Sequence, residues 1–201
     1  MEKKEKKGQS RVGRQLFHMV MGILIILGLI FVPRPTSLII LFILLVISLI
    51  LAIFLRRFKI PFINYFIDRL EKKGDEKKFP GKGFIFLLAG SLLVAKLFPM
   101  DIALASIAIL TFGDATANLT RKAIPIKKRG IFKNMTGTLV GIIVSFFAAL
   151  LFIIPLYAII AAAIAMFVES LAIKLGESEA DDNIIIPLVA GTVIYILKFI
   201  I

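Results

Sequence analysis

The amino-acid sequence predicts an all-α integral membrane protein, a bundle of about seven transmembrane helices. Hydrophobic residues make up 59% of the 201 residues, whereas a soluble domain holds about 45–50%. The mean hydropathy is +0.98, and apolar runs of roughly spanning length recur between short turns. The chain has no cysteine and one histidine, which excludes disulfides, thiolate metal sites and multi-histidine metal sites.

The apolar runs define the predicted elements in order. Seven segments qualify or nearly qualify as spanning helices, at 15–32, 36–55, 84–99, 101–120, 137–154, 156–174 and 184–200. Prolines punctuate the short connections on one side, where they cannot continue a helix: Pro33, Pro35, Pro99 and Pro155. No small-residue cleavage site follows the first segment, so we expect a retained helix. We therefore expect a basic head at 1–13 and one membrane domain at 14–201.

Lysine and arginine placement predicts the orientation. Of the 25 basic residues, 21 fall before the first predicted helix or in the loops 56–82 and 121–133, and Lys174 lies at the end of a helix expected to reach the same face. The exceptions are Arg34, Lys96 and Lys198. The positive-inside rule then places the N-terminus inside and the C-terminus outside. We attribute the net charge of +12 to basic residues that set the membrane orientation and contact anionic lipid, rather than to binding of nucleic acid. We expect the plasma membrane of a prokaryote, with the active site facing the cytoplasm.

Residues 57–82 predict an amphipathic helix on the inner leaflet. Their apolar members follow helical spacing, with charged residues between them: Phe62, Ile63, Phe66, Ile67 and Leu70. Pro61 suits the first turn of such a helix and Gly74 suits its end.

Asp114 is the most informative single residue, because it lies inside an apolar segment. An ionisable side chain at the centre of a membrane helix costs about 2.5–3.5 kcal/mol and usually has a function. Thr111, Asp114 and Asn118 form one polar stripe, and Asp114 lies about 9 Å below the predicted helix end. A carboxylate there could hold Mg²⁺. The alternative is a bond to a neighbouring helix or to a lysine.

Basic residues after this segment are candidates for phosphate binding. A triphosphate could be neutralised by Arg121, Lys127, Lys128 and Arg129, although topology and anionic lipid would give the same pattern. Lys133 precedes Thr136-Gly137-Thr138, which opens the next predicted helix. Thr136 could cap that helix, whose free backbone N–H groups could bind an anion. An ordinary helix cap is equally compatible with the spacing.

Acidic residues at the same predicted face could complete a site. Glu169 is a candidate second metal ligand or base, or a partner of Lys174. Asp182 and Asn183 suit metal or ribose contacts, whereas Asp181 suits the electrostatics of a helix N-terminus.

His18 shares a helical face with Arg14 at a spacing of four residues. It is a candidate base for proton transfer. An interhelical hydrogen bond is the alternative, and for a lone histidine the commoner one.

These pieces, in this order, resemble the CTP-dependent lipid kinases: dolichol, phytol and farnesol kinases and the CTP-using diacylglycerol kinase of fungi. More distantly, the chain is similar to phosphatidate cytidylyltransferases. Five motifs carry the resemblance: Arg14-Gln15-Leu16-Phe17-His18, Gly113-Asp114-Ala115-Thr116-Ala117, Lys133-Asn134-Met135-Thr136-Gly137-Thr138, Glu169, and Asp182-Asn183 with Pro187. Gln15 replaces the family's usual lysine. Thr136 stands where the family often has glutamate, so no residue at this position can perform the role of that glutamate in this chain.

The resemblance implies transfer of the CTP γ-phosphate to an isoprenoid alcohol. Mg²⁺ would be held by Asp114 with Asp182 or Glu169, and His18 or Glu169 could accept the alcohol proton. Lys133 would be catalytic, and the nucleotide would be bound by the remaining candidates: Arg14, Asn118, Arg121, Lys127, Lys128, Arg129, Thr136, Gly137, Thr138 and Asn183. The alternatives are a cytidylyltransferase forming a CDP-lipid, a small multi-pass transporter and a non-catalytic lipid-binding protein. Homo-oligomerisation is left open.

Overall fold

The computed structural model describes residues 2–58, 79–124, 135–171, 174–175, 178–179 and 181–200. Side chains of residues 2–11 and 174–179 lie outside this description. The predicted amphipathic helix falls largely on 59–78, outside the described residues. Lys127, Lys128, Arg129 and Lys133 do so as well.

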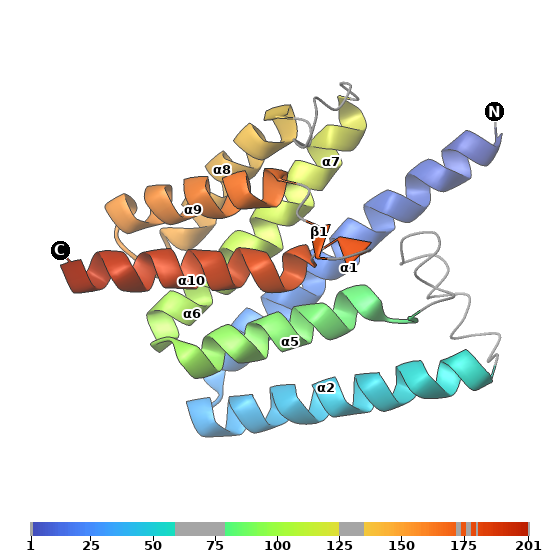
Figure 1. Ribbon diagram of the computed structural model, residues 1–201, viewed down its shortest axis with the longest axis horizontal. Coiled ribbons are helices and arrows are strands. Elements are labelled where there is room, and N and C mark those ends of the chain that lie inside the picture. Colours follow the sequence, from blue (N-terminus) through green and yellow to red (C-terminus); the bar gives the residue numbers. More distant parts are fainter. Residues whose placement is uncertain are drawn as a thin grey trace.

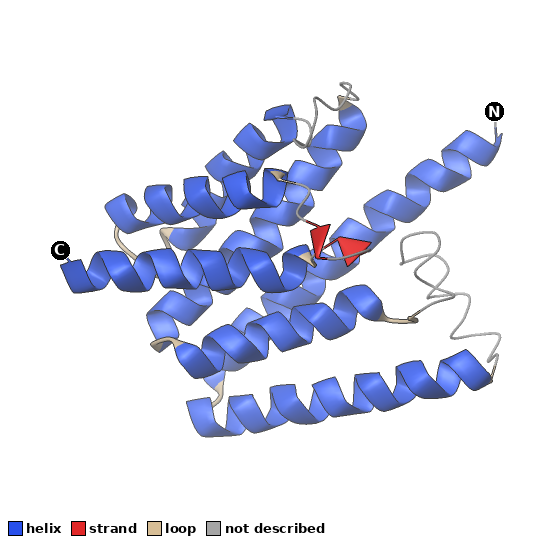
Figure 2. Cartoon of the chain, viewed as in Figure 1, coloured by secondary structure: helices blue, strands red, loops and turns tan. Residues whose placement is uncertain are grey.

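Helices make up nearly all of the described chain (Figures 1 and 2). They are α1 (Glu2–Phe31), α2 (Arg34–Arg57), α5 (Lys82–Leu97), α6 (Met100–Ala108), the π-helix η1 (Ile109–Asp114), α7 (Ala115–Ala123), α8 (Met135–Ala149), α9 (Pro155–Ser170) and α10 (Asp182–Ile200). The two-residue strands β1 (Lys174–Leu175) and β2 (Ser178–Glu179) form a small antiparallel hairpin. The helical fold class is confirmed.

Four helices in the described ranges are long and apolar enough to cross a membrane: Val12–Phe31, Arg34–Arg57, Met100–Ala123 and Asp182–Ile200. α8 and α9 are shorter apolar helices. One predicted boundary was wrong, because the helix expected to reach residue 174 ends at Ser170, before the hairpin. α1 begins at Glu2 and so includes the predicted basic head, and its part of spanning length begins at Val12.

The helices run back and forth between two ends of the bundle (Figure 1). α2, α7 and α9 end, and α5, α8 and α10 begin, at the end where α1 starts. The opposite end holds the short connections after α1, α5 and α8, together with the C-terminus. The prolines marked these connections correctly, because α2 has proline in its first turn and α9 begins with one.

Charged side chains at the C-terminal end of the bundle have partners within the fold. The Arg34 guanidinium donates hydrogen bonds to the carbonyls of Ala95, at 2.8 Å, and Phe98, at 2.7 Å, at the end of α5. Lys198 forms an ion pair with Asp101. Arg34 and Lys198, two of the three basic residues predicted at this end, therefore stabilise helix ends and helix packing.

The helix Met100–Ala123, which comprises α6, η1 and α7, is the centre of the bundle. Its apolar window is 78% buried, against 17% for α2. Small residues allow α8 to lie directly on it. A Cβ on Gly137 would come within 2.6 Å of the Ala117 carbonyl oxygen, and one on Gly141 within 3.1 Å of the Gly113 carbonyl oxygen. Close approach of this kind is the usual way that helices associate without large apolar side chains.

Candidate metal centre

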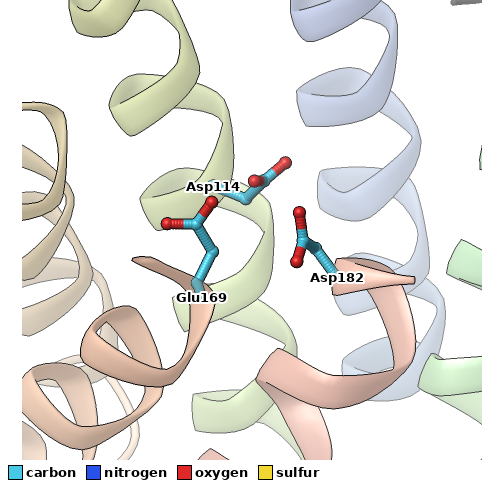
Figure 3. Close-up of side chains that lie close together, drawn as sticks. All are labelled: Asp114, Glu169 and Asp182. Carbon is cyan, nitrogen blue, oxygen red and sulfur yellow. The ribbon is translucent and has the colours of Figure 1, made fainter. Parts of the chain in front are cut away.

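Three carboxylates from remote parts of the chain converge inside the bundle (Figure 3). Asp114 ends η1, Glu169 lies near the end of α9, and Asp182 opens α10. One oxygen from each lies within 4.8 Å of the other two. Asp114 is 7% and Glu169 1% exposed. The 9 residues of α7 separate Asp114 from the helix end, a rise of about 14 Å, deeper than the sequence indicated.

The π-helix gives Asp114 its local setting. A π turn leaves the regular hydrogen-bond ladder and is often found at functional sites. The buried Ser145 hydroxyl of α8 donates to the Ile109 carbonyl at 3.3 Å, so it serves a backbone oxygen of the irregular segment. One turn beyond Asp114, the Asn118 amide nitrogen donates to its carboxylate at 2.7 Å. Asn118, predicted to contact nucleotide, therefore orients Asp114.

Arg121 binds Glu169 with both arms of its guanidinium. The two nitrogen–oxygen distances are 2.8 and 2.6 Å, and Nη2 also donates to the Thr138 hydroxyl at 3.0 Å. The side chains are 12% and 0% exposed, so the pair is buried. A bidentate arginine–carboxylate pair has strong and directional hydrogen bonds. From the sequence, Lys174 is a possible partner of Glu169, whereas the structure shows Arg121 in an ion pair with it.

The start of α8 packs against this pair. A Cβ on Gly137 would lie 2.5 Å from Cγ of Arg121, so only glycine leaves room for the arginine side chain. Thr138 is 1% exposed and faces the same guanidinium. The phosphate-binding roles of Gly137 and Thr138 stay predictions, but both residues position Arg121. α8 begins at Met135, so Thr136 lies within the first turn rather than before it.

Asp181 holds the start of α10, as the sequence indicated. Its carboxylate accepts a hydrogen bond from the backbone N–H of Asn183 at 3.2 Å and faces Lys82 at 3.6 Å. Its carbonyl accepts from the N–H groups of Ile184 and Ile185. An acidic N-cap of this kind stabilises a helix, and it leaves the next residue, Asp182, to face the other two carboxylates.

Asn183 fixes α10 to α5. Its side-chain amide donates to the Gly83 carbonyl at 3.3 Å. Pro187 has no N–H to offer the Asn183 carbonyl one turn earlier, and that oxygen would lie 2.1 Å from a Cβ on Gly90. The backbone of α10 therefore sits directly on α5. Asn183, predicted to contact the nucleotide, anchors the helix that carries Asp182.

α1 contributes His18 at the edge of the site. Gly22 packs on Thr111, because a Cβ there would lie 2.2 Å from the Thr111 hydroxyl oxygen. His18 precedes Gly22 by one turn and therefore shares its face. Its Nε2 is buried and has no hydrogen-bond partner. Arg14, one turn earlier, is half-buried.

The donor set fits a hard divalent cation. Carboxylate oxygens are the ligands that Mg²⁺ and Ca²⁺ prefer. Carboxylates this close repel one another unless positive charge is shared among them, and Arg121 already engages Glu169. Asp114 and Asp182 are thus better placed to bind an ion than Glu169.

Sequence reasoning missed the pairing of Arg121 with Glu169 and the π-helix. One signal was available for the packing that supports the pair. Gly137, Gly141 and Ser145 recur every four residues, the small-residue spacing of closely packed membrane helices.

The fold and the acidic cluster define a class: a helical protein with apolar helices of membrane-spanning length and three clustered carboxylates that could hold a cation. An uncharacterised protein of Methanocaldococcus jannaschii is 27% identical over 186 residues, which cover 90% of this chain and 91% of that protein. The similarity thus extends over nearly the whole length. No family model and no solved structure matches the chain.

Proposed function

We propose that the protein is an integral membrane kinase that transfers the γ-phosphate of CTP to an isoprenoid alcohol, such as a polyprenol or dolichol. The products are the lipid monophosphate and CDP. The observation that carries the proposal is the convergence of Asp114, Glu169 and Asp182 within 4.8 Å, among apolar helices. The resemblance of the site motifs to CTP-dependent lipid kinases supplies the donor and the class of acceptor.

The proposal includes seven crossings, with the N-terminus and the site at the cytoplasmic face. The alternation of the helices between two ends supports it. The basic residues of the sequence, concentrated in the first half of α1 and in the connections after α2 and α7, support the same orientation. A nucleotide would reach the site from water, and the lipid would reach it from the bilayer.

Phosphoryl transfer depends mainly on positioning and on neutralising charge. When bound, Mg²⁺ would offset negative charge on the triphosphate, and Asp114 and Asp182 would hold it. Asn118 orients Asp114, Asn183 anchors the helix of Asp182, and Arg121 fixes Glu169.

The reaction balances with the groups available. The alcohol oxygen bonds to the γ-phosphorus while the bond to the bridging β–γ oxygen breaks, and CDP leaves with that oxygen. The hydroxyl proton passes to a base. Both oxygens of Glu169 accept hydrogen bonds from Arg121, whereas His18 Nε2 has no hydrogen-bond partner, so His18 is the better placed of the two candidates to receive the proton.

The test is phosphate transfer from γ-labelled CTP to a polyprenol in detergent micelles containing Mg²⁺. Asp114→Asn should reduce the rate by at least about 100-fold. Asp101→Asn is the matched control, because Asp101 lies at the opposite end of the same helix, and it should retain the wild-type rate. Full activity of Asp114→Asn would refute the assignment. Cytidine label in the lipid product would instead identify a cytidylyltransferase.

A further inference from the structure

The Thr111 hydroxyl is a buried polar group without a hydrogen-bond partner. Thr111 is 0% exposed, and its Oγ1 accepts and donates no hydrogen bond. A threonine in a helix normally donates to a carbonyl of the preceding turn. Thr116 and Thr120 do so, at 2.6 and 2.8 Å. Among apolar helices an unpaired polar group costs free energy, so the exception needs a reason.

A second orphan atom lies on the facing helix. His18 Nε2 is also buried and unpartnered. α1 and the helix of η1 and α7 run in opposite directions (Figure 1). Gly22 contacts Thr111, so the residue one turn before Gly22, which is His18, lies at the same level as the residue one turn after Thr111, which is Asp114. His18, Thr111 and Asp114 thus line one seam between the two helices, and the Asp114 side chain points toward α1 in Figure 3.

We propose that this seam binds the hydroxyl group of a membrane lipid alcohol, with Thr111 Oγ1 and His18 Nε2 as its hydrogen-bond partners. The inference rests on the proposed function, in which that hydroxyl is the phosphate acceptor, and it names the acceptor subsite. Two orphan atoms suit one hydroxyl, which can donate one hydrogen bond and accept another.

The surroundings of α1 favour a lipid over a water-soluble alcohol. Only 28% of the most apolar stretch of α1 is buried, whereas 78% of that of Met100–Ala123 is buried. The outer side of α1 exposes a run of large apolar residues: Leu16, Val20, Ile23, Leu24 and Leu27. The seam thus separates a peripheral helix from the central one. Gly22 packs directly on Thr111, so entry of the hydroxyl requires α1 to move outward.

Binding of phytol and of the matched hydrocarbon phytane to the purified full chain, without nucleotide, tests the subsite. The wild type should bind phytol and gain thermal stability from it, with no specific gain from phytane. Thr111→Val, which keeps the volume, should weaken phytol binding about tenfold. Without ligand its Tm should equal or exceed that of the wild type, because an unsatisfied group is removed.

Ser106→Ala is the matched control. Ser106 is equally buried on the same long helix, but its hydroxyl donates to the Ile102 carbonyl at 2.7 Å, so phytol binding should not change. His18→Phe should weaken binding to a similar extent and serves if Thr111→Val does not fold. Equal binding of phytol and phytane by the wild type, or undiminished binding by both site variants, would overturn the proposal.

This readout is independent of phosphate transfer. Phytol binding that depends on Thr111 in a protein without kinase activity would uphold the subsite and refute the proposed function. Phosphate transfer by a protein whose phytol binding does not depend on Thr111 or His18 would uphold the proposed function and refute the subsite.

Discussion

Replacing Arg121 by methionine should destabilise the protein far more than an ordinary surface change. The substitution removes two hydrogen bonds to Glu169 and one to Thr138. It also leaves a carboxylate that is 1% exposed without this guanidinium. Breaking a buried ion pair by removing one partner costs about 3–5 kcal/mol. For a chain of this size that corresponds to a fall in Tm on the order of 10 °C.

A double substitution separates the pair from the space it fills. Arg121→Met with Glu169→Met replaces both charges by apolar groups, which is often neutral or stabilising. The double variant should therefore recover most of the lost Tm. Arg121→Lys keeps the charge but cannot donate two parallel hydrogen bonds, so its Tm should lie between those of wild type and Arg121→Met.

The assay is thermal unfolding of the purified protein in one detergent, without nucleotide or divalent ion. Two results would contradict the reasoning. One is an Arg121→Met variant whose Tm lies within about 2 °C of the wild type. The other is a double variant no more stable than the single one. Either result would mean that Glu169 does not depend on Arg121 for its charge balance.

Two further predictions concern packing and topology. Gly137→Ala should lower the free energy of unfolding by about 1–3 kcal/mol, because its Cβ would meet a backbone oxygen at 2.6 Å. Gly28→Ala, with no atom within 4 Å of the new Cβ, should be neutral or slightly stabilising in the same unfolding measurement. The chain has no cysteine, so single cysteines report topology without background. A membrane-impermeant maleimide should label Lys122→Cys and Lys198→Cys from opposite sides of the membrane, and labelling from one side would exclude seven crossings.

The helices were predictable because their signals are local. Apolar runs of sufficient length and prolines at the turns specify where each helix lies, and α2 and α9 do carry proline in their first turns. Asp114 stood out for the same reason, as one charge in an apolar run. The placement of Asp181 at a helix start also followed from its neighbours in sequence.

The contacts that build the site were not predictable from one sequence, because they join distant segments. Nothing local indicates that Arg121 meets Glu169 rather than a phosphate. The role of Asn183 depends on Gly90, which lies on another helix. Ile109–Asp114 also continues the apolar run of α6 without a proline, so no local signal in the sequence marks the π-helix.

The π-helix means that the central helix changes phase halfway along its length. In a regular helix, residues that face one neighbour keep facing it, and the direction of that stripe around the helix axis changes only slowly. The wider turn of η1 adds about one residue, so side chains after it point in a different direction around the axis from those before it. α6 can then be matched to α10 and α7 to α8 as two separately optimised surfaces. In evolutionary terms, a one-residue insertion or deletion at this point would rotate Asp114 and α7 against α6, re-aiming the site in a single step.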